Sequence, residues 1–298
     1  MKKVLIAGGS GLIGRRLTHL LQEEGYEVMW LSRSASDSGD IKTFIWNPAK
    51  GEIDSQAIME ADALITLSGA GVADGRWTTS YKKKIIESRL QVASTLLDAL
   101  NKTRHHVQCL LTASAIGIYG DRGEELLTES STTGSGFLSE TCSYWESAYS
   151  NSPIRTVSIR IGIVLSKDGG ALPEMAAPMK AGICPVLGSG QQYMSWIHID
   201  DLCRIFIHAL KENQLQSVYN AVAPTPVTHQ TFMHTLRKTI APYSLTLPTP
   251  AFLLKLFLGE KSAIVLDSAR VSADKILHTG FQFKFRDLSA ALKNIYGR

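Results

Sequence analysis

The feature that most constrains this chain is a glycine-rich turn close to its amino terminus. Residues 4–8 form a continuous apolar run, which is typical of a strand buried on both faces. Gly8, Gly11 and Gly14 follow in GxxGxxG spacing, and residues 12–24 place apolar side chains at helical spacing. The glycines allow a tight turn, a close approach of the main chain to a pyrophosphate, and close packing of helix on strand.

This strand–turn–helix arrangement predicts a dinucleotide-binding site. The free N–H groups at the start of a helix and its positive dipole end both favour an anion. Ser10, Leu12 and Ile13 lie in the turn and in the first turn of the expected helix. We therefore expect these three residues, with the three glycines, to hold the pyrophosphate of the cofactor.

The rest of the first half alternates short strand patterns with helical patterns. The expected strands are residues 27–32, 43–46, 63–67, 107–113 and 154–160, and the expected helices are 79–101 and 138–150. Such alternation predicts an α/β fold, a Rossmann-type doubly wound parallel sheet with helices on its faces. We expect the dinucleotide-binding domain to cover residues 1–165.

The second half has a different sequence pattern, because glycine and proline residues after Gly162 separate shorter elements. We expect a smaller, mixed α/β substrate-side region over residues 166–298, with helices at 199–210 and 228–241. Its last part, residues 247–298, is expected to form a small C-terminal domain. Residues 252–258 are strongly apolar. We interpret them as a buried helix, and a lid or a subunit contact is the alternative.

Charge and cysteine content exclude several classes of protein. The formal net charge is +4, spread along the sequence, which predicts no nucleic-acid groove and no membrane patch. No run reaches the roughly 18 apolar residues of a membrane span. The four cysteines are widely spaced and form no CxxC pair, so we expect neither disulfides nor a metal site. A cytoplasmic setting is expected.

The second expected strand decides between NAD and NADP. It ends in Leu31-Ser32-Arg33-Ser34, and no carboxylate follows before Asp37. An NAD site usually has an acidic residue here for the ribose 2′-hydroxyl, whereas an arginine can pair with a 2′-phosphate. We therefore predict NADP(H) as the cofactor, with Ser32, Arg33 and Ser34 at its 2′-phosphate.

Several short motifs occur in the order found in extended short-chain dehydrogenase/reductases of the nucleotide-sugar epimerase type. These motifs are the glycine triplet, Leu67-Ser68-Gly69-Ala70, Ser114 with Tyr119-Gly120, and Trp196-Ile197-His198-Ile199-Asp200-Asp201. The chain resembles this family over residues 2–220. The resemblance implies that Leu67, Ser68, Gly69, Ser114 and Arg160 contact the cofactor.

A narrower resemblance is to an atypical epimerase-like branch of that family. It is carried by Arg76-Trp77-Thr78, Ser88-Arg89, Gly117-Ile118-Tyr119-Gly120, Phe137-Leu138, Trp145-Glu146 and Gly188-Ser189-Gly190-Gln191. The stretch from Leu247 to Leu288 also resembles the small C-terminal domain of that branch. The resemblance therefore extends over nearly the whole chain.

The Tyr-x-x-x-Lys pair on which the chemistry of the family depends is missing. With Glu146 aligned to the glutamate that commonly follows this motif, Leu138 and Cys142 occupy the tyrosine and lysine positions. Ser114 and Tyr119 are then the candidate catalytic residues, with a role in the cofactor pocket as the alternative. Without a lysine, the phenol of Tyr119 should be a poor base.

Other polar residues are candidates for contact with a substrate. Glu140 lies one helical turn from Tyr144 and could carry a proton, and Cys142 is an equal candidate for a direct role. A purely structural place in the helix is the alternative for both. Gln192 and Trp196 lie in or beside the glycine-rich stretch that borders the substrate in relatives.

A metal site is not expected. His198-x-Asp200-Asp201 could be mistaken for a set of metal ligands. It directly precedes an expected helix, where aspartates commonly cap N–H groups.

Two functions remain open. The first is an NADP(H)-dependent oxidoreductase or epimerase-like enzyme that acts on a small hydroxyl or carbonyl compound through a non-standard proton relay. The second is a non-catalytic module that senses or sequesters NADP(H). The missing Tyr/Lys pair favours the module, and the polar glycine-rich region favours the enzyme. A homodimer is also considered, and the partner expected in either case is a small molecule.

Overall fold

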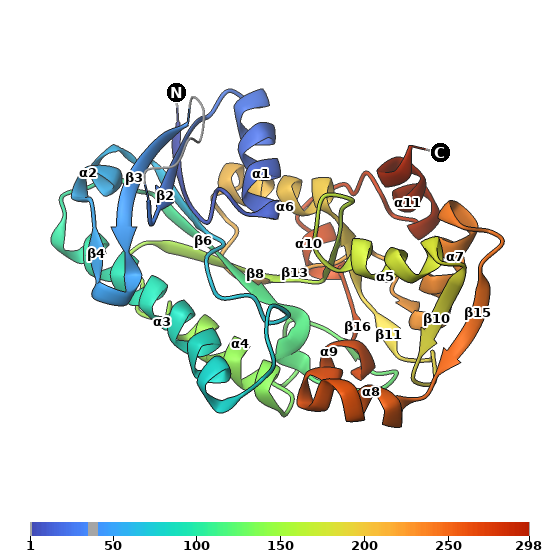
Figure 1. Cartoon of the computed structure of the whole chain (residues 1–298). Helices are drawn as coiled ribbons and strands as arrows, with labels where there is room; N and C mark the ends of the chain where they lie inside the picture. Colours follow the sequence, from blue (N-terminus) through green and yellow to red (C-terminus); the bar gives the residue numbers. More distant parts are fainter. Residues whose placement is uncertain (1, 35–40, 298) are drawn as a thin grey trace. The chain divides into compact units, whose positions relative to one another are not determined.

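The computed structural model describes residues 2–34 and 41–297, and an eight-stranded sheet organises its first part (Figure 1). The strand order is β13-β8-β6-β5-β1-β2-β3-β4. The strands are β1 (Lys3–Ala7), β2 (Glu27–Ser32), β3 (Lys42–Asn47), β4 (Glu52–Ile53), β5 (Ala63–Thr66), β6 (Cys109–Ala115), β8 (Arg155–Ile161) and β13 (Ser217–Ala221). Strands β3, β2, β1, β5 and β6 are joined by parallel pairings, and β4 adds to β3 antiparallel. This order confirms the predicted α/β, Rossmann-type fold.

Helices cover both faces of this sheet, with α3 and α4 on the face opposite α1 (Figure 1). They are α1 (Leu12–Glu23), α2 (Ser55–Glu60), α3 (Thr79–Lys102), α4 (Phe137–Ser147) and α6 (Ile199–Lys211), with short 3₁₀ turns η1 (Pro48–Lys50) and η2 (Ile116–Tyr119). Helix α1 forms because Leu17 and Leu21 make a fully buried stripe, and it ends before Gly25, which adopts a left-handed φ of 81°. Because helices cover both faces of the sheet, its central strands are continuous apolar runs.

Two compact units can be distinguished, and each is built from several segments. Unit 1 comprises residues 1–115, 140–160 and 203–219, and unit 2 comprises residues 116–139, 161–202 and 220–298. Sequence analysis expected two continuous domains that divide at residue 165. That the two parts act as separate domains stays a prediction.

Unit 2 is organised by short strand pairs and a helical core. The pairs are β10 (Ile183–Leu187) with β15 (Leu245–Thr249), β11 (Tyr193–Met194) with β14 (Val227–Thr228), β12 (Trp196–His198) with β9 (Ile163–Leu165), and β16 (Arg270–Val271) with β7 (Leu126–Leu127). The helices are α5 (Ala171–Lys180), α7 (His229–Ile240), α8 (Ala251–Leu258), α9 (Ala263–Leu266), α10 (Asp274–Leu277), α11 (Leu288–Tyr296) and the 3₁₀ turn η3 (Gly259–Ser262). Trp196, Phe232, Phe285 and Leu292 lie in one buried cluster of this unit.

Helix α8 differs from the sequence prediction. The apolar run 252–258 is helical, as expected, yet no residue of α8 is buried. The interpretation as a buried helix is therefore wrong, and the exposed faces of this helix are considered below. Among the described residues, no helix is long and apolar enough to cross a membrane.

Candidate functional site

The glycine turn brings the ends of β1 and β5 together. Gly8 adopts a φ of 91°, which only glycine adopts readily. A Cβ at Gly8 would lie 3.1 Å from the main chain of Leu67 and Ser68. The N–H of Leu67 also donates to the carbonyl of Ala7 over 2.8 Å. The turn and the predicted Leu67-Ser68-Gly69 stretch are therefore neighbours at the carboxyl edge of the sheet.

The start of α1 is open to an anion. A Cβ at Gly14 would lie 2.6 Å from the carbonyl oxygen of Gly9, so the helix can approach the turn only with glycine here. Gly11 caps the helix without a side-chain hydrogen bond, and the first turn carries no acidic residue. The N–H groups of Leu12 and Ile13 have no partner within the helix. This geometry has room for the pyrophosphate of a dinucleotide. That Ser10, Leu12, Ile13 and the glycines contact it stays a prediction.

The end of β2 presents the residues assigned to the 2′-phosphate. Arg33 and Ser34 are exposed just after the strand, and the N–H of Ser34 donates to the hydroxyl of Ser32 over 3.4 Å. Asp37 lies outside the described residues. The role of Ser32, Arg33 and Ser34 stays a prediction.

A buried polar network lies at the carboxyl ends of β6 and β8. The hydroxyl of Ser114 donates to the carboxylate of Glu146 on α4 over 2.6 Å. Arg160 donates to both carboxylate oxygens of Glu146, over 2.8 Å each. The side chains of Arg160 and Glu146 are 9% and 15% exposed. Arg160, predicted to contact the cofactor, is therefore engaged by Glu146, for which the sequence predicted no role in the site.

Arg89 on α3 is a second buried cation of unit 1. Its guanidinium lies over the ring of Trp145 at 4.6 Å, and one nitrogen donates to the carbonyls of Ala70 and Ile85 over 3.0 and 2.9 Å. Its Nε has no hydrogen-bond partner, and no carboxylate of residues 2–34 or 41–297 pairs with it. Burial lowers the pKa of Arg89.

The position of Arg89 in α3 is itself a signal in the sequence, beyond the resemblance of Ser88-Arg89. Arg89 interrupts the buried stripe of α3, four residues after Ile85 and three before Val92. An arginine inside an apolar stripe is unusual, because lysine and arginine are almost never fully buried unless they are paired.

Cys142 faces the same buried region from α4. Burial raises the pKa of its thiol to about 12, while the charge of Arg89 lowers it and that of Glu146 raises it. A thiol with this pKa stays protonated at neutral pH and is a weak nucleophile. Glu140, two residues earlier on α4, is exposed. Its contact with a substrate stays a prediction.

Tyr119 is held within unit 2. It has no exposed surface, and its hydroxyl donates to the side-chain oxygen of Asn220 over 2.7 Å. The side-chain nitrogen of Asn220 in turn donates to the carbonyl of Ser272. The phenol is therefore enclosed within unit 2, and its catalytic role stays a prediction.

Gln192 and Trp196 are also enclosed in unit 2. Trp196 has no exposed surface and donates its indole N–H to the carbonyl of Thr225 over 3.2 Å. The amide of Gln192 donates to the carbonyls of Leu187 and Val265 over 3.0 and 3.1 Å. The side chain of Trp196 belongs to the core, and the substrate contacts of Gln192 and Trp196 stay predictions.

The His198–Asp201 stretch has a structural role in unit 2, and its capping of α6 stays a prediction. The carboxylate of Asp201 is fully buried and accepts the N–H groups of Lys284 and Phe285 over 2.9 and 2.8 Å. The ring of His198 stacks on Phe285 with centroids 4.0 Å apart. Asp201 therefore fixes the chain before α11. Within the described residues, no group of three or more His, Cys, Asp or Glu side chains could hold a metal ion.

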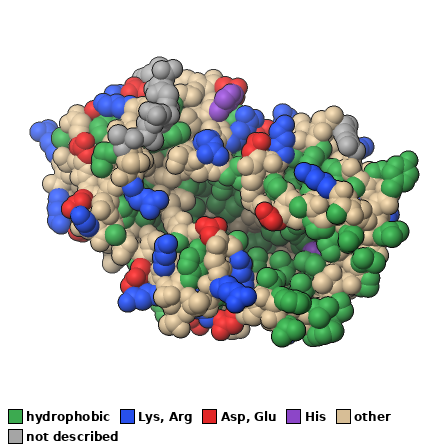
Figure 2. Space-filling model, in the orientation of Figure 1, with side chains coloured by type: hydrophobic (Ala, Val, Ile, Leu, Met, Phe, Trp, Pro, Cys, Tyr) green, Lys and Arg blue, Asp and Glu red, His purple; other side chains and the backbone are tan. Residues whose placement is uncertain are grey.

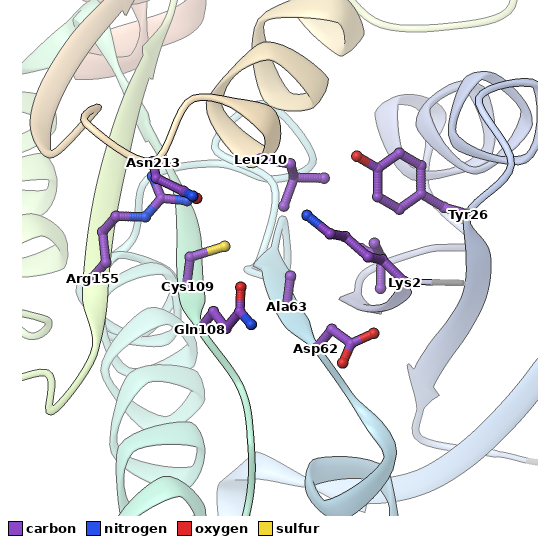
Figure 3. A pocket seen from close by; sticks show the side chains of 10 residues that line it. Lys2, Tyr26, Asp62, Ala63, Gln108, Cys109, Arg155, Leu210 and Asn213 are labelled. Atoms are coloured by element: carbon purple, nitrogen blue, oxygen red, sulfur yellow. The ribbon is translucent and has the colours of Figure 1, made fainter.

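A small cavity of unit 1 lies at the opposite edge of the sheet. It has a volume of about 210 Å³ and is lined by Lys2, Asp62, Cys109, Arg155 and Asn213, among others (Figure 3). These residues surround the amino ends of β1, β5, β6 and β8. Ligands of parallel sheets bind at the carboxyl ends, so this cavity is separate from the glycine turn.

Two family models match the chain. The NAD dependent epimerase/dehydratase family matches residues 4–221. A domain of unknown function, DUF1731, matches residues 249–295. The first match includes the glycine turn and the Ser114–Glu146–Arg160 network.

Relatives resemble the chain over nearly its whole length. The epimerase family protein SSP1921 of Staphylococcus saprophyticus is 35% identical, over 99% of both chains. A chloroplastic homolog of the epimerase family protein SDR39U1 from Arabidopsis thaliana is 34% identical, over 98% of this chain and 86% of the relative. The crystal structure of human SDR39U1 with NADPH is 31% identical, with a TM-score of 0.89 over 99% of both chains.

Proposed function

The chain belongs to the NAD dependent epimerase/dehydratase family, and we propose that it is an NADP(H)-dependent oxidoreductase or epimerase-like enzyme. The proposed substrate is a small compound with a hydroxyl or carbonyl group. The observation that carries this proposal is the buried network of Ser114, Glu146 and Arg160. It lies at the carboxyl edge of the sheet, where ligands of this fold bind.

The proposed cofactor is supported by the glycine turn and by Arg33. Gly8, Gly11 and Gly14 leave room for a pyrophosphate at the start of α1, and Arg33 is exposed where a 2′-phosphate would lie. The NADPH in the structure of human SDR39U1 supports the same choice. When bound, NADP(H) supplies or accepts a hydride at its nicotinamide.

In this proposal, Ser114 and Glu146 move the proton. A substrate hydroxyl gives its proton to Oγ of Ser114, while the proton of Ser114 passes to the Glu146 carboxylate 2.6 Å away. The serine stays neutral, and the carboxylate becomes a carboxylic acid. Reduction of a carbonyl runs the same transfer in reverse. Arg160 orients the carboxylate through its two hydrogen bonds.

Arg89 supplies a positive charge in place of the missing lysine. By resemblance, Cys142 occupies the lysine position, and the charge of Arg89 acts on that thiol. A guanidinium without a carboxylate partner can stabilise negative charge that develops on a substrate oxygen.

The second candidate function is a module that binds NADP(H) without turnover. Leu138 and Cys142 occupy the positions of the catalytic tyrosine and lysine, and Ser114 is only 2% exposed. These observations favour a protein that binds the cofactor and does not catalyse a reaction.

Measurements of binding and turnover separate the two functions. NADPH fluorescence gives the affinity, and NADPH oxidation is followed with aldehydes, ketones and nucleotide sugars. An enzyme binds NADPH and turns over at least one class. Ser114→Ala then lowers kcat about 100-fold, whereas Ser143→Ala, at an exposed serine of α4, is the matched control. Tight binding without turnover identifies the module, and absence of binding contradicts both functions.

A further inference from the structure

Strands β10 and β15 of unit 2 present an apolar face to solvent. They pair in parallel with Ile183 opposite Leu245, so these two side chains and that of Leu247 lie on one face. Their exposed fractions are 41%, 70% and 46%. On the other face, Cys184 is fully buried. In a sheet with one face in water, apolar residues usually point to the core and polar residues to the solvent. An apolar face in water is therefore unusual.

Helix α8 continues the same apolar surface. It begins two residues after the end of β15, and none of its residues is buried. Phe252, Leu256 and Phe257 are 68%, 74% and 71% exposed. A helix that is apolar all round is normally enclosed by protein or membrane. The fold of the single chain therefore leaves α8 without the cover that its sequence requires.

These side chains form one patch, which gathers over α8 and β15 (Figure 2). We call it the α8–β15 patch, and its eight members are Ile183, Tyr243, Leu245, Leu247, Phe252, Leu256, Phe257 and Leu258. A large side chain has roughly 150–250 Å² of surface. With the measured exposed fractions, the patch presents on the order of 900 Å², whereas the largest apolar patch of a monomer is about 300–600 Å².

We propose that a second copy of this chain covers the α8–β15 patch in a two-fold symmetric dimer. The area matches the roughly 800 Å² that each partner contributes to a stable interface. The near absence of charge in the patch suits homodimer interfaces, which are more apolar than other interfaces. Two copies of the same patch are self-complementary across a two-fold axis.

The charge of α8 also argues against a membrane as the occupant. Helices that lie in a membrane surface carry a strongly charged face beside the apolar one. Lys255 is the one charged residue between Ala251 and Leu258. The helix therefore lacks the polar side that would face water.

Sedimentation velocity of the full chain tests this proposal. The wild-type protein should sediment as a dimer at micromolar concentration. The double change Leu256→Asp and Phe257→Asp should raise the apparent dissociation constant by about tenfold or more, because it places charges at the centre of the interface. Tyr144→Asp, at an exposed aromatic residue of α4, is the matched control and should leave the dimer intact.

Circular dichroism establishes that each variant is folded. A single Phe257→Cys or Leu256→Cys change offers a second measurement, since the four natural cysteines are buried. A bismaleimide should then link two chains through at least one of these positions. The proposal is overturned by a wild-type monomer, by dissociation through Tyr144→Asp instead, or by absence of cross-linking. Co-sedimentation with phosphatidylglycerol vesicles that the double variant abolishes would overturn it in favour of a membrane.

Discussion

Ser114 and Glu146 are joined by a 2.6 Å hydrogen bond between the end of β6 and helix α4. The same carboxylate receives two hydrogen bonds from Arg160. Glu146 therefore neutralises the buried charge of Arg160 and also accepts a hydrogen bond from the hydroxyl of Ser114. Its substitution should affect stability and turnover together.

Glu146→Gln should lower the free energy of unfolding by on the order of 3–5 kcal/mol, because it leaves the charge of Arg160 buried without a counter-ion. Urea denaturation measures this loss. Glu140→Gln changes an exposed carboxylate of the same helix and should stay within about 0.5 kcal/mol of wild type. Equal effects of the two changes would show that the ion pair does not contribute to stability.

Arg33→Asp should weaken the binding of NADPH by about tenfold or more, because it replaces a charge-assisted hydrogen bond with repulsion of the 2′-phosphate. NADH lacks this phosphate and should lose far less affinity. Fluorescence titration with both cofactors measures the difference. Arg286→Asp, at an exposed arginine of unit 2, serves as control. Equal losses for NADPH and NADH would refute the assignment of Arg33.

The native protein should resist alkylation at Cys142. Burial raises the pKa of this thiol to about 12, so the reactive thiolate is scarce at pH 8. Iodoacetamide labelling followed by mass spectrometry should find Cys142 unmodified until guanidinium unfolds the chain. Ser143→Cys places an exposed thiol at the next position of α4 and should react at once. Rapid labelling of Cys142 in the folded protein would contradict its burial.

Stability should fall as the pH drops below about 6.5. Burial lowers the pKa of His229 from 6.5 to about 4, so between these values the unfolded chain binds a proton that the folded chain does not. The loss begins at the unfolded pKa and is complete near pH 4, with a size on the order of 3 kcal/mol. His229→Gln should flatten the thermal unfolding profile over this window. His19→Gln, at an exposed histidine, should leave the slope unchanged.

Much of unit 1 could be predicted because its elements carry local signals. Strands such as β2 (Glu27–Ser32) and β5 (Ala63–Thr66) are continuous apolar runs, and the structure places their ends within two residues of the predicted ones. Helix α3 (Thr79–Lys102) was predicted from its buried stripe in the same way. The glycine turn was also correctly placed, since its spacing depends on the main chain alone.

Unit 2 and the buried network were predicted less well, because both depend on partners far away in sequence. Strand β16 has two residues and exists only through its pairing with β7. Glu146 gains its importance from Ser114 and Arg160, which are 32 and 14 residues away. No local pattern of α4 indicates these contacts. The apolar run of α8 predicted burial, which the single chain does not provide.

The carboxylate of Asp201 binds the N–H groups of Lys284 and Phe285, close to the end of the chain. Phe285 and Leu292 fill the same core as Trp196. The segment matched by the second family model therefore contributes to the core of unit 2, and its folding as a small C-terminal domain stays a prediction. During synthesis, the interior of unit 2 can close only after Phe285 and Leu292 have left the ribosome. A chain cut before residue 249 would lose two N–H donors to this carboxylate and the side chains of Phe285 and Leu292 from the core.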